Sequence, residues 1–338
     1  MIKENSPLEK LLKLPHRVCE STCYINGLED IFEWKGAEYM PFMLSVLGGM
    51  GEFSYLRFKL ATPPNMVYFG ANPKYLLDDL GQIMGFRQEV FENRVFKNTF
   101  PKIKEFIDEE KPVVAGALDM YYLHYYPSIY HKQHIPIHYV LIVGYDDGES
   151  NVFVHDCTFC GIQAVSYGEF EKSLNVNTPG MSRKNTFRVF SLPDKLISEL
   201  DAAKKGFNYR AQKMLNPPVI LIGIPAMRKL AKEIFDWEDE GSFNHLITYA
   251  TIPPHIPKTF EKSNGMRQWK SQVLRALGEK YDISGWVKAA DLFDKSGKLI
   301  IELCKSASKR DRASISELLL KVAEIEEEAY TILKDCKK

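Results

Sequence analysis

The sequence predicts an α+β protein, in which a mixed N-terminal half with an antiparallel sheet precedes an all-helical C-terminal half. The clearest strand signal is a β-hairpin, because "IHYVLIVGYDD" and "NVFVHDC" flank a turn at Asp147 and Gly148. Another buried strand is expected over residues 113–118. Apolar residues then recur at helical spacing toward the C-terminus. We therefore expect one domain over residues 1–195 and a helical domain over residues 196–338.

The composition narrows the classes of partner that suit this chain. Its 338 residues are 45% hydrophobic and 26% charged, which is typical of a globular protein. Because 44 basic residues balance 44 acidic ones, no net charge attracts nucleic acid or an anionic membrane. The N-terminus lacks the apolar core of a signal peptide, and no apolar run reaches the roughly 18 residues that span a bilayer. We expect a cytoplasmic protein without a nucleic-acid or membrane partner.

The cysteines do not follow the pattern of a disulfide-stabilised secreted domain, because the chain is long and lacks an export signal. We expect reduced thiols, which leaves packing, metal ligation and nucleophilic catalysis as their roles. The six residues are Cys19, Cys23, Cys157, Cys160, Cys304 and Cys336.

A histidine and an aspartate on the predicted hairpin are placed to interact. If the turn centres near Asp147 or Gly148, cross-strand partners have numbers that sum to about 294 to 296. His138 then lies opposite Asp156 or one pair along from it. Their even separation puts both side chains on one face of the sheet, whereas His155 points to the other face. We therefore expect Asp156 to orient the imidazole of His138.

Cys19 is the candidate nucleophile in the sequence. The residues after it carry apolar side chains at near-helical intervals, which places Cys19 at or just before a helix N-terminus. The helix dipole and free backbone N–H groups favour a thiolate there. We expect Cys19 to attack a carbonyl, with His138 as the base and Asp156 fixing its tautomer. The backbone N–H of Cys19 would hold the oxyanion. Cys23, one turn later in line with the apolar face, is assigned to packing.

Each of these residues has a structural alternative. A cysteine among apolar helix residues is often a small buried hydrophobe, and a strand histidine is often a hydrogen-bonded structural residue. Zinc is a competing use of the thiols, because Cys19-x3-Cys23 and Cys157-x2-Cys160 together supply four thiolates. The first spacing, inside a predicted helix, is unusual for a zinc site, so we expect no metal.

Two further segments are weaker candidates for substrate contacts. The turn in "LGGMGEF", with Gly49 and Gly51, is a place where backbone can approach a ligand, although a plain turn explains it as well. The tyrosine- and histidine-rich run at residues 119–138 suits the wall of a cleft, with Asp119 and Tyr121 at its start. Aromatic packing and a simple cap are the alternatives for that run.

Four segments, taken in order, resemble the N-terminal domain of the butirosin biosynthesis protein H family. They are "CESTCYINGLEDIFEWKG", "MLSVLGGMGEFSYLRF", "KPVVAGALDMYYLHYY" and "HYVLIVGYDDGESNVFVHDC". The resemblance covers most of residues 15–195. The helical half, particularly "PAMRKLAKEIFDW" and "NGMRQWKSQVLRAL", resembles the uncharacterised helical domain that commonly follows it. The resemblance implies a papain-like, cysteine-protease-type fold for the N-terminal domain.

The same resemblance implies an activity. The family is distantly similar to bacteriocin-processing cysteine peptidases, whose catalytic order Cys, His, Asp matches Cys19, His138 and Asp156. Its named member moves an aminoacyl group from an acyl carrier protein thioester to an aminoglycoside amine. The resemblance therefore implies an acyltransferase of secondary metabolism with an acyl-Cys19 intermediate. The donor is a carrier-protein or acyl-pantetheine (phosphopantetheine) thioester, the acceptor is a small-molecule amine, and no cofactor is needed.

Two departures from the family pattern bear on the site. Related peptidases often carry a glutamine before the cysteine as oxyanion donor, whereas residues 11–18 are "LLKLPHRV", so His16 or a backbone group would have to take its place. Cys157 stands where a proline often follows the acid. A cysteine amidase or peptidase and a catalytically silent binding protein are the alternative functions. Acceptor binding, carrier docking and dimerisation are the roles open to the helical half.

Overall fold

The computed structural model describes residues 9–18, 22–70, 73–251 and 264–336. The chain forms two compact units, and each is assembled from two stretches of sequence. Unit 1 consists of Met1–Leu44 and Asn72–Leu196, and unit 2 consists of Ser45–Ala71 and Ile197–Lys338.

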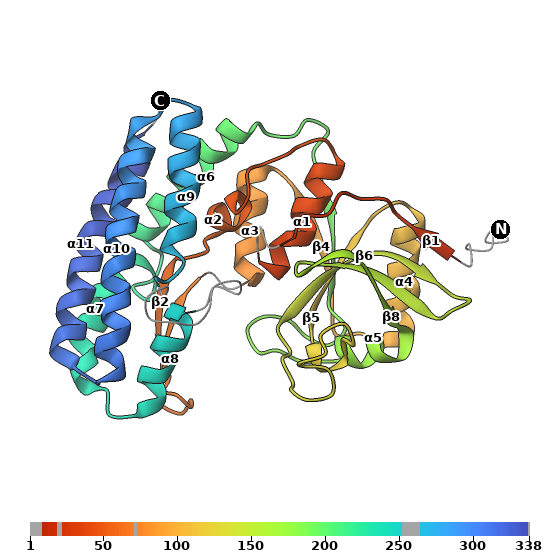
Figure 1. Cartoon of the computed structure of the whole chain (residues 1–338), viewed down its shortest axis with the longest axis horizontal. Coiled ribbons are helices and arrows are strands. Elements are labelled where there is room, and N and C mark those ends of the chain that lie inside the picture. The colour runs from red at the N-terminus through yellow and green to blue at the C-terminus, as the bar shows by residue number, and fades with distance from the viewer. Residues whose placement is uncertain (1–8, 19–21, 71–72, 252–263, 337–338) are drawn as a thin grey trace. The chain divides into compact units, whose positions relative to one another are not determined.

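Unit 1 is built on an antiparallel sheet (Figure 1). Its strands are β1 (Glu9–Leu11), β4 (Arg87–Phe91), β5 (Val113–Leu118), β6 (His138–Asp146), β7 (Asn151–Asp156), β8 (Phe159–Ser166) and β9 (Phe187–Ser191). They run in the order β4, β9, β5, β6, β7, β8, and β1 pairs with the end of β6. The predicted hairpin is β6–β7, in which Leu141 pairs with His155 and Ile142 with Val154. The residue numbers of these two pairs sum to 296, the upper end of the predicted range, whereas a register shift between Ile142 and Gly144 brings the pairs nearer the turn to 297.

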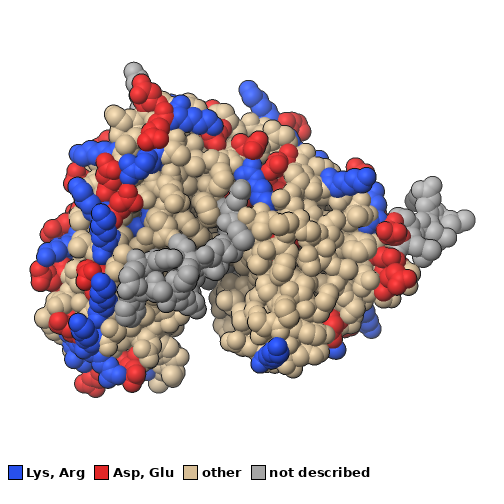
Figure 2. Space-filling model, viewed as in Figure 1, with Lys and Arg blue, Asp and Glu red and all other residues tan. Residues whose placement is uncertain are grey.

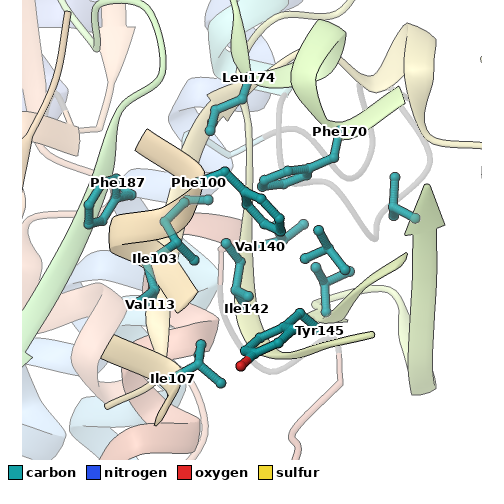
Figure 3. Close-up of a cluster of buried hydrophobic side chains, with 14 of the residues drawn as sticks. Phe100, Ile103, Ile107, Val113, Val140, Ile142, Tyr145, Phe170, Leu174 and Phe187 are labelled. Carbon is teal, nitrogen blue, oxygen red and sulfur yellow. The ribbon is translucent and has the colours of Figure 1, made fainter. Parts of the chain in front are cut away.

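Helices cover both faces of this sheet. They are α1 (Cys23–Trp34), α3 (Pro73–Met84), α4 (Phe96–Asp108) and α5 (Tyr167–Leu174), with the short η1 (Met120–Tyr122). On β6, Val140 and Ile142 point into the core that α4 and α5 enclose (Figure 3). Leu141, between them in sequence, faces α1, where a Cβ at Gly27 would lie 3.0 Å from its Cβ. The glycine thus lets α1 lie close to the sheet.

Unit 2 combines a β-hairpin with a bundle of helices. Its elements are β2 (Phe53–Arg57), β3 (Asn65–Phe69), α6 (Glu199–Leu215), α7 (Gly223–Glu233), η2 (Ile234–Asp236), α8 (Glu240–Thr251), α9 (Arg267–Lys280), α10 (Ser284–Ser308) and α11 (Arg312–Asp335), and α2 (Met43–Gly48) leads into it. The long helices α9, α10 and α11 pack side by side (Figure 1). A buried ion pair between Arg267 and Glu326 joins α9 to α11.

Residues 45–71, which the sequence analysis assigns to the first domain, lie in unit 2. The reason is that the β2–β3 hairpin finds its partners among the helices and their connections. The backbone N–H of Tyr55 donates to the carbonyl oxygen of Leu221 at 2.9 Å, and its hydroxyl donates to Glu233 at 3.0 Å. A two-stranded hairpin is marginally stable alone, so these contacts decide which unit it joins.

The expected α+β class is confirmed, with an antiparallel sheet in the N-terminal part and helices toward the C-terminus. None of the described helices is long and apolar enough to cross a membrane. On the visible face of unit 2, Figure 2 shows basic and acidic side chains interspersed over the helices. Ion pairs such as Lys321 with Glu317 belong to this mixed pattern.

Candidate active site

The first helix of unit 1 begins at Cys23. Thr22 is its N-cap residue, with extended backbone (φ −94°, ψ 154°), and its carbonyl oxygen accepts hydrogen bonds from the N–H groups of Ile25 and Asn26, both at 2.9 Å. The positive end of the helix dipole therefore lies at Cys23. The sequence pattern predicts this end near Cys19, which is one turn too early. Cys19 itself lies outside the described residues, so its predicted role stays a prediction.

The predicted neighbours on the hairpin come together. His138 is the first residue of β6 and Asp156 is the last residue of β7. The imidazole Nε2 of His138 lies 2.6 Å from Oδ2 of Asp156. The Asp156 side chain is fully buried, and that of His138 is 8% exposed, so little water competes for this hydrogen bond.

The Cys23 thiol lies beside the imidazole of His138. Burial alone lowers the pKa of His138, but the Asp156 carboxylate, with a smaller contribution from Cys23, reverses this and raises the pKa to about 10. Because Nε2 is engaged with Asp156, Nδ1 is the nitrogen left to exchange a proton with the thiol. Cys23 is half-buried and stands at the helix N-terminus, so the assignment of this residue to packing misses its main contact.

Asp156 is held by more than the histidine. The hydroxyl of Tyr125 donates to its Oδ2 at 3.0 Å, and the hydroxyl of Tyr126 donates to its Oδ1 at 2.6 Å. The backbone N–H of Thr158 donates to the same Oδ1 at 3.1 Å. Burial raises the pKa of Asp156, but His138 and these donors outweigh it, and the net shift is downward. The carboxylate therefore stays ionised in a fixed orientation.

The two tyrosines come from the aromatic run that the sequence analysis treats as a cleft wall. Burial, and then the charge of Asp156, raises the pKa of Tyr126 far above its usual value, and Tyr125 shifts in the same direction. Both hydroxyls therefore remain donors at any ordinary pH. Composition marks this run as unusual, but nothing in its spacing indicates which hydroxyls reach Asp156, because that depends on the loop between β5 and β6.

His16 belongs to a second buried network, next to the first. Its Nδ1 lies 2.8 Å from Oδ2 of Asp30 on α1, and Nδ1 of His155 lies 3.0 Å from the same oxygen. Its Nε2 lies 2.9 Å from the carbonyl oxygen of Phe159 and 3.2 Å from that of Asp156. His16 thus ties α1 to the backbone of Asp156. The sequence suggests His16 as a possible donor to the oxyanion. Because both of its ring nitrogens are engaged in this network, His16 is not placed to make that hydrogen bond.

The donor atoms of His16, Asp30 and His155 lie within 4.8 Å of one another, so we tested whether they fit a metal ion. Carbonyl oxygens only accept hydrogen bonds, so Nε2 of His16 carries a proton. Burial lowers the pKa of His16, but Asp30 more than reverses this, which favours an imidazolium with a second proton on Nδ1. The nitrogen–oxygen distances are also those of hydrogen bonds. The three residues fit an ion-paired network and do not fit a metal site.

The weaker substrate candidates serve local structure. Asp119 accepts from the backbone N–H of Tyr121 at 3.0 Å and from that of Ile135 at 2.9 Å, so it organises its own loop. Tyr121 stacks on His134, with ring centroids 4.1 Å apart. These contacts match the cap and packing alternatives.

The glycines of the early turn lie in the helical unit. Gly49 and Gly51 both have positive φ, of 104° and 74°. The carbonyl oxygen of Gly51 accepts a hydrogen bond from the buried Lys270 ammonium at 3.1 Å. Both residues therefore belong to unit 2, whereas Cys23, His138 and Asp156 belong to unit 1.

The fold and these contacts define an α+β protein in which a cysteine at a helix N-terminus faces a buried histidine–aspartate pair. Residues 22–157 match the family described as "Butirosin biosynthesis protein H, N-terminal", in agreement with the resemblance found in the sequence. Residues 173–256 match "Domain of unknown function (DUF4872)". No curated protein matches the chain.

The first family match bears on the choice between the two cysteines. It begins at Thr22 and extends to Cys157, so it includes Cys23, His138 and Asp156. Cys19 lies before its start. The part of the chain that carries the family pattern therefore contains a complete Cys, His, Asp set without Cys19.

Proposed function

We propose that this protein is a thiol-dependent acyltransferase whose nucleophile is Cys23. The observation that carries the proposal is the position of Cys23, at the N-terminus of α1 and beside the imidazole that Asp156 holds at 2.6 Å. A nucleophile, a base and a group that orients the base are the parts that covalent acyl transfer requires. The match of residues 22–157 to a family named for a biosynthesis protein supports a synthetic reaction.

In the first half-reaction, the Cys23 sulfur attacks the carbonyl carbon of a thioester. The proton of the Cys23 thiol is held on Nδ1 of His138, whose raised pKa keeps it there near neutral pH, and a carbon–sulfur bond to Cys23 forms. The backbone N–H of Cys23, at the positive end of α1, is one donor for the oxyanion of the tetrahedral intermediate. When the intermediate collapses, the bond to the donor sulfur breaks and His138 returns the proton to the leaving thiol. An acyl-Cys23 intermediate remains.

In the second half-reaction, an amine attacks the acyl-Cys23 carbonyl. His138 takes a proton from the amine, a carbon–nitrogen bond forms, and the bond to Cys23 breaks. The proton then returns to the Cys23 sulfur, so the enzyme is restored and the product is an amide. Asp156 keeps Nε2 of His138 engaged throughout, which leaves Nδ1 facing the reacting atoms.

The partners in this proposal follow the family resemblance. The donor is an acyl carrier protein or a free acyl-pantetheine thioester, and the acceptor is a small-molecule amine. No metal or organic cofactor takes part in either half-reaction. Hydrolysis uses the same residues with water in place of the amine, so the test includes it as an outcome.

The test uses intact-mass measurement of the full chain with acyl-pantetheine thioesters. Cys23→Ala and Cys19→Ala form a matched pair, since each removes one thiol. We expect the wild type and Cys19→Ala to gain one acyl group, Cys23→Ala to gain none, and added amine to release the acyl group as an amide. Peptide mapping after alkylation with iodoacetamide identifies the reactive thiol independently.

The other outcomes decide against this proposal in different ways. An adduct on Cys23→Ala that is lost in Cys19→Ala returns the nucleophile to Cys19. An acyl-Cys23 adduct discharged by water as fast as by amines makes the protein a hydrolase. The absence of an adduct with every thioester, together with an unreactive Cys23, supports a binding protein with this fold.

A further inference from the structure

Arg188 is a buried arginine in the layer between the sheet and α1 of unit 1. It lies on β9, opposite Val114 of β5, and Val114 in turn lies opposite Leu141 of β6. Cross-strand partners share a face, and Val114 and Leu141 both lie next to Gly27 of α1. The Arg188 residue is only 3% exposed. Its guanidinium is therefore enclosed on the helix-covered face of the sheet.

The guanidinium has donors without acceptors. Within the part of the chain that the structure describes, its Nε and Nη1 atoms are buried and have no hydrogen-bond partner. Nor does any described carboxylate lie within ion-pair distance of it. Its recorded neighbour is the ring of Tyr139, 6.0 Å from the guanidinium carbon. A buried cation without a paired anion is costly, so an arginine in this state indicates a missing anionic partner.

Tyr139 adds a second buried donor in the same place. Tyr139 is only 1% exposed, and its hydroxyl faces Arg188, but no described group accepts a hydrogen bond from that hydroxyl. Burial raises the pKa of Tyr139 to about 12, while the nearby Arg188 acts to lower it and Cys23 acts to raise it. Tyr139 therefore lies close to both Arg188 and Cys23. Its ring also contacts that of Tyr24, the residue after Cys23, with centroids 5.9 Å apart, so these donors adjoin the proposed nucleophile.

We propose that Arg188 and Tyr139 bind a carboxylate carried by the acyl group that is delivered to Cys23. This inference rests on the proposed function and names its donor class: a thioester whose acyl chain bears a free carboxylate. Nη2 of the guanidinium, together with either Nε or Nη1, can donate two parallel hydrogen bonds to a carboxylate, and the Tyr139 hydroxyl can donate a third. Burial strengthens each of these interactions and makes the site discriminate against acyl groups that lack the charge.

A phosphate is the other common oxyanion that an arginine binds, and a phosphopantetheine donor carries one. Its phosphate stands at the far end of the pantetheine arm from the thioester, whereas Arg188 adjoins Tyr139 beside Cys23. The position of the arginine therefore favours an anion on the acyl side of the thioester.

The test compares succinyl-pantetheine with butyryl-pantetheine, which have acyl chains of equal length and differ in a terminal carboxylate. We expect the wild type to form the succinyl adduct at least about tenfold faster. Arg188→Met should lose this preference, so that its rates with the two donors become similar. Tyr139→Phe, a smaller change that keeps the ring, should lose part of the preference. Both rates are read from intact mass.

A second measurement does not depend on acylation. Succinate should raise the melting temperature of the wild type but not that of Arg188→Met, and butyramide, which has no charge, should raise neither. Equal acylation rates for the two donors, unaffected by Arg188→Met, overturn the inference while leaving the acyltransferase proposal intact. Conversely, stabilisation by succinate that requires Arg188, without acylation by any donor, supports the anion site and rejects the acyltransferase. A preference that depends on the phosphate of phosphopantetheine donors assigns the site to the phosphate instead.

Discussion

Both units bury arginine side chains, but they treat them differently. In unit 2, Nε and Nη2 of Arg267 donate to the two carboxylate oxygens of Glu326 at 2.7 and 2.8 Å, and both side chains have no exposed surface. In unit 1, Arg188 is nearly as buried, and the described residues offer its Nε and Nη1 no acceptor. The buried charge of Arg267 is paired within the protein, so a structural role accounts for it. The charge of Arg188 has no described partner and lies near the candidate nucleophile, so we infer that a ligand supplies the partner.

The two units also differ in what their buried carboxylates hold in place. Glu326 accepts from Arg267 and from the hydroxyl of Ser296, and thereby joins three helices of unit 2. Asp156 accepts a hydrogen bond from Nε2 of His138, and the other ring nitrogen, Nδ1, faces Cys23. A buried carboxylate therefore holds helices together in unit 2, whereas in unit 1 it orients the imidazole of His138.

The largest expected effect comes from neutralising the carboxylate that orients the histidine. Asp156→Asn should reduce the rate of Cys23 acylation by about 10² to 10⁴-fold, because the amide favours the wrong tautomer of His138. Glu326→Gln is the matched change in unit 2 and should leave the rate of the folded protein unchanged. The rate is followed by intact mass under single-turnover conditions. An Asp156→Asn variant with the wild-type rate would remove Asp156 from the mechanism.

A second comparison concerns the free energy of unfolding of arginine variants. Arg267→Met should destabilise unit 2 by about 3 to 5 kcal/mol, because it leaves the Glu326 carboxylate buried and unpaired. Arg188→Met should change the free energy of unfolding of unit 1 by less than about 1 kcal/mol, or stabilise it, since no described acceptor loses a partner. Urea unfolding, followed in each unit by hydrogen exchange, measures both. Equal losses would show that Arg188 has a structural partner.

The fold follows from the sequence where signals are local. The alternation along β6 and the turn at Asp147 and Gly148 predict the hairpin, and the hairpin brings His138 to Asp156. The helical periods predict the second half. The hairpin of residues 45–71 is assigned to the wrong part of the chain because its partners, such as Leu221 and Glu233, lie far along the sequence. No local pattern encodes that pairing.

The site is predicted less completely, for the same reason. Helical spacing identifies the face on which Cys23 lies, but the exact start of α1 decides which cysteine stands at the dipole, and helix boundaries are the least certain part of such a prediction. Nothing in the sequence indicates that Arg188 of β9 lies near Tyr139, because strand order in the sheet places them together. Likewise, the donors Tyr125 and Tyr126 depend on a loop conformation.

The pH dependence of unfolding should have opposite signs in the two units. The folded pKa of His138 is raised to about 10, against 6.5 for the free side chain, so its stabilising effect is full below 6.5 and is lost as the pH rises toward 10. Burial lowers the pKa of Lys270 to about 7, against 10.5 when free. The unfolded state binds that proton more readily, so unit 2 gains stability as the pH rises from 7 to 10.5.

Each of these groups should contribute a slope of at most about 1.4 kcal/mol per pH unit. Hydrogen exchange at pH 7 to 10 in β6 and β7, and separately in α9 and α11, measures the two slopes. His138→Gln should flatten the slope measured in β6 and β7 and leave the slope in α9 and α11 unchanged. Lys270→Met should flatten the slope in α9 and α11 and leave that in β6 and β7 unchanged. Parallel slopes in the two units would contradict the assignment of these shifts to His138 and Lys270.

The smallest expected effect compares two helix starts. In unit 2, Ser198 caps α6, because its hydroxyl oxygen accepts from the backbone N–H of Asp201 at 3.1 Å. In unit 1, Thr22 stands at the same position of α1 but makes no such side-chain bond. Ser198→Ala should therefore cost about 1 kcal/mol of unfolding free energy, whereas Thr22→Ala should cost a few tenths at most.

The absence of a cap bond at Thr22 has a functional meaning if Cys23 is the nucleophile. A capping side chain at position 22 accepts from the N–H of Tyr24 or Ile25, which places its oxygen beside the Cys23 N–H that the oxyanion needs. Thr22→Asp, which supplies a strong capping acceptor, should then stabilise α1 and slow acylation of Cys23. Urea unfolding and single-turnover acylation of the same variant test the two halves of this statement. A variant that is more stable and equally fast would show that the first turn of α1 plays no part in the reaction.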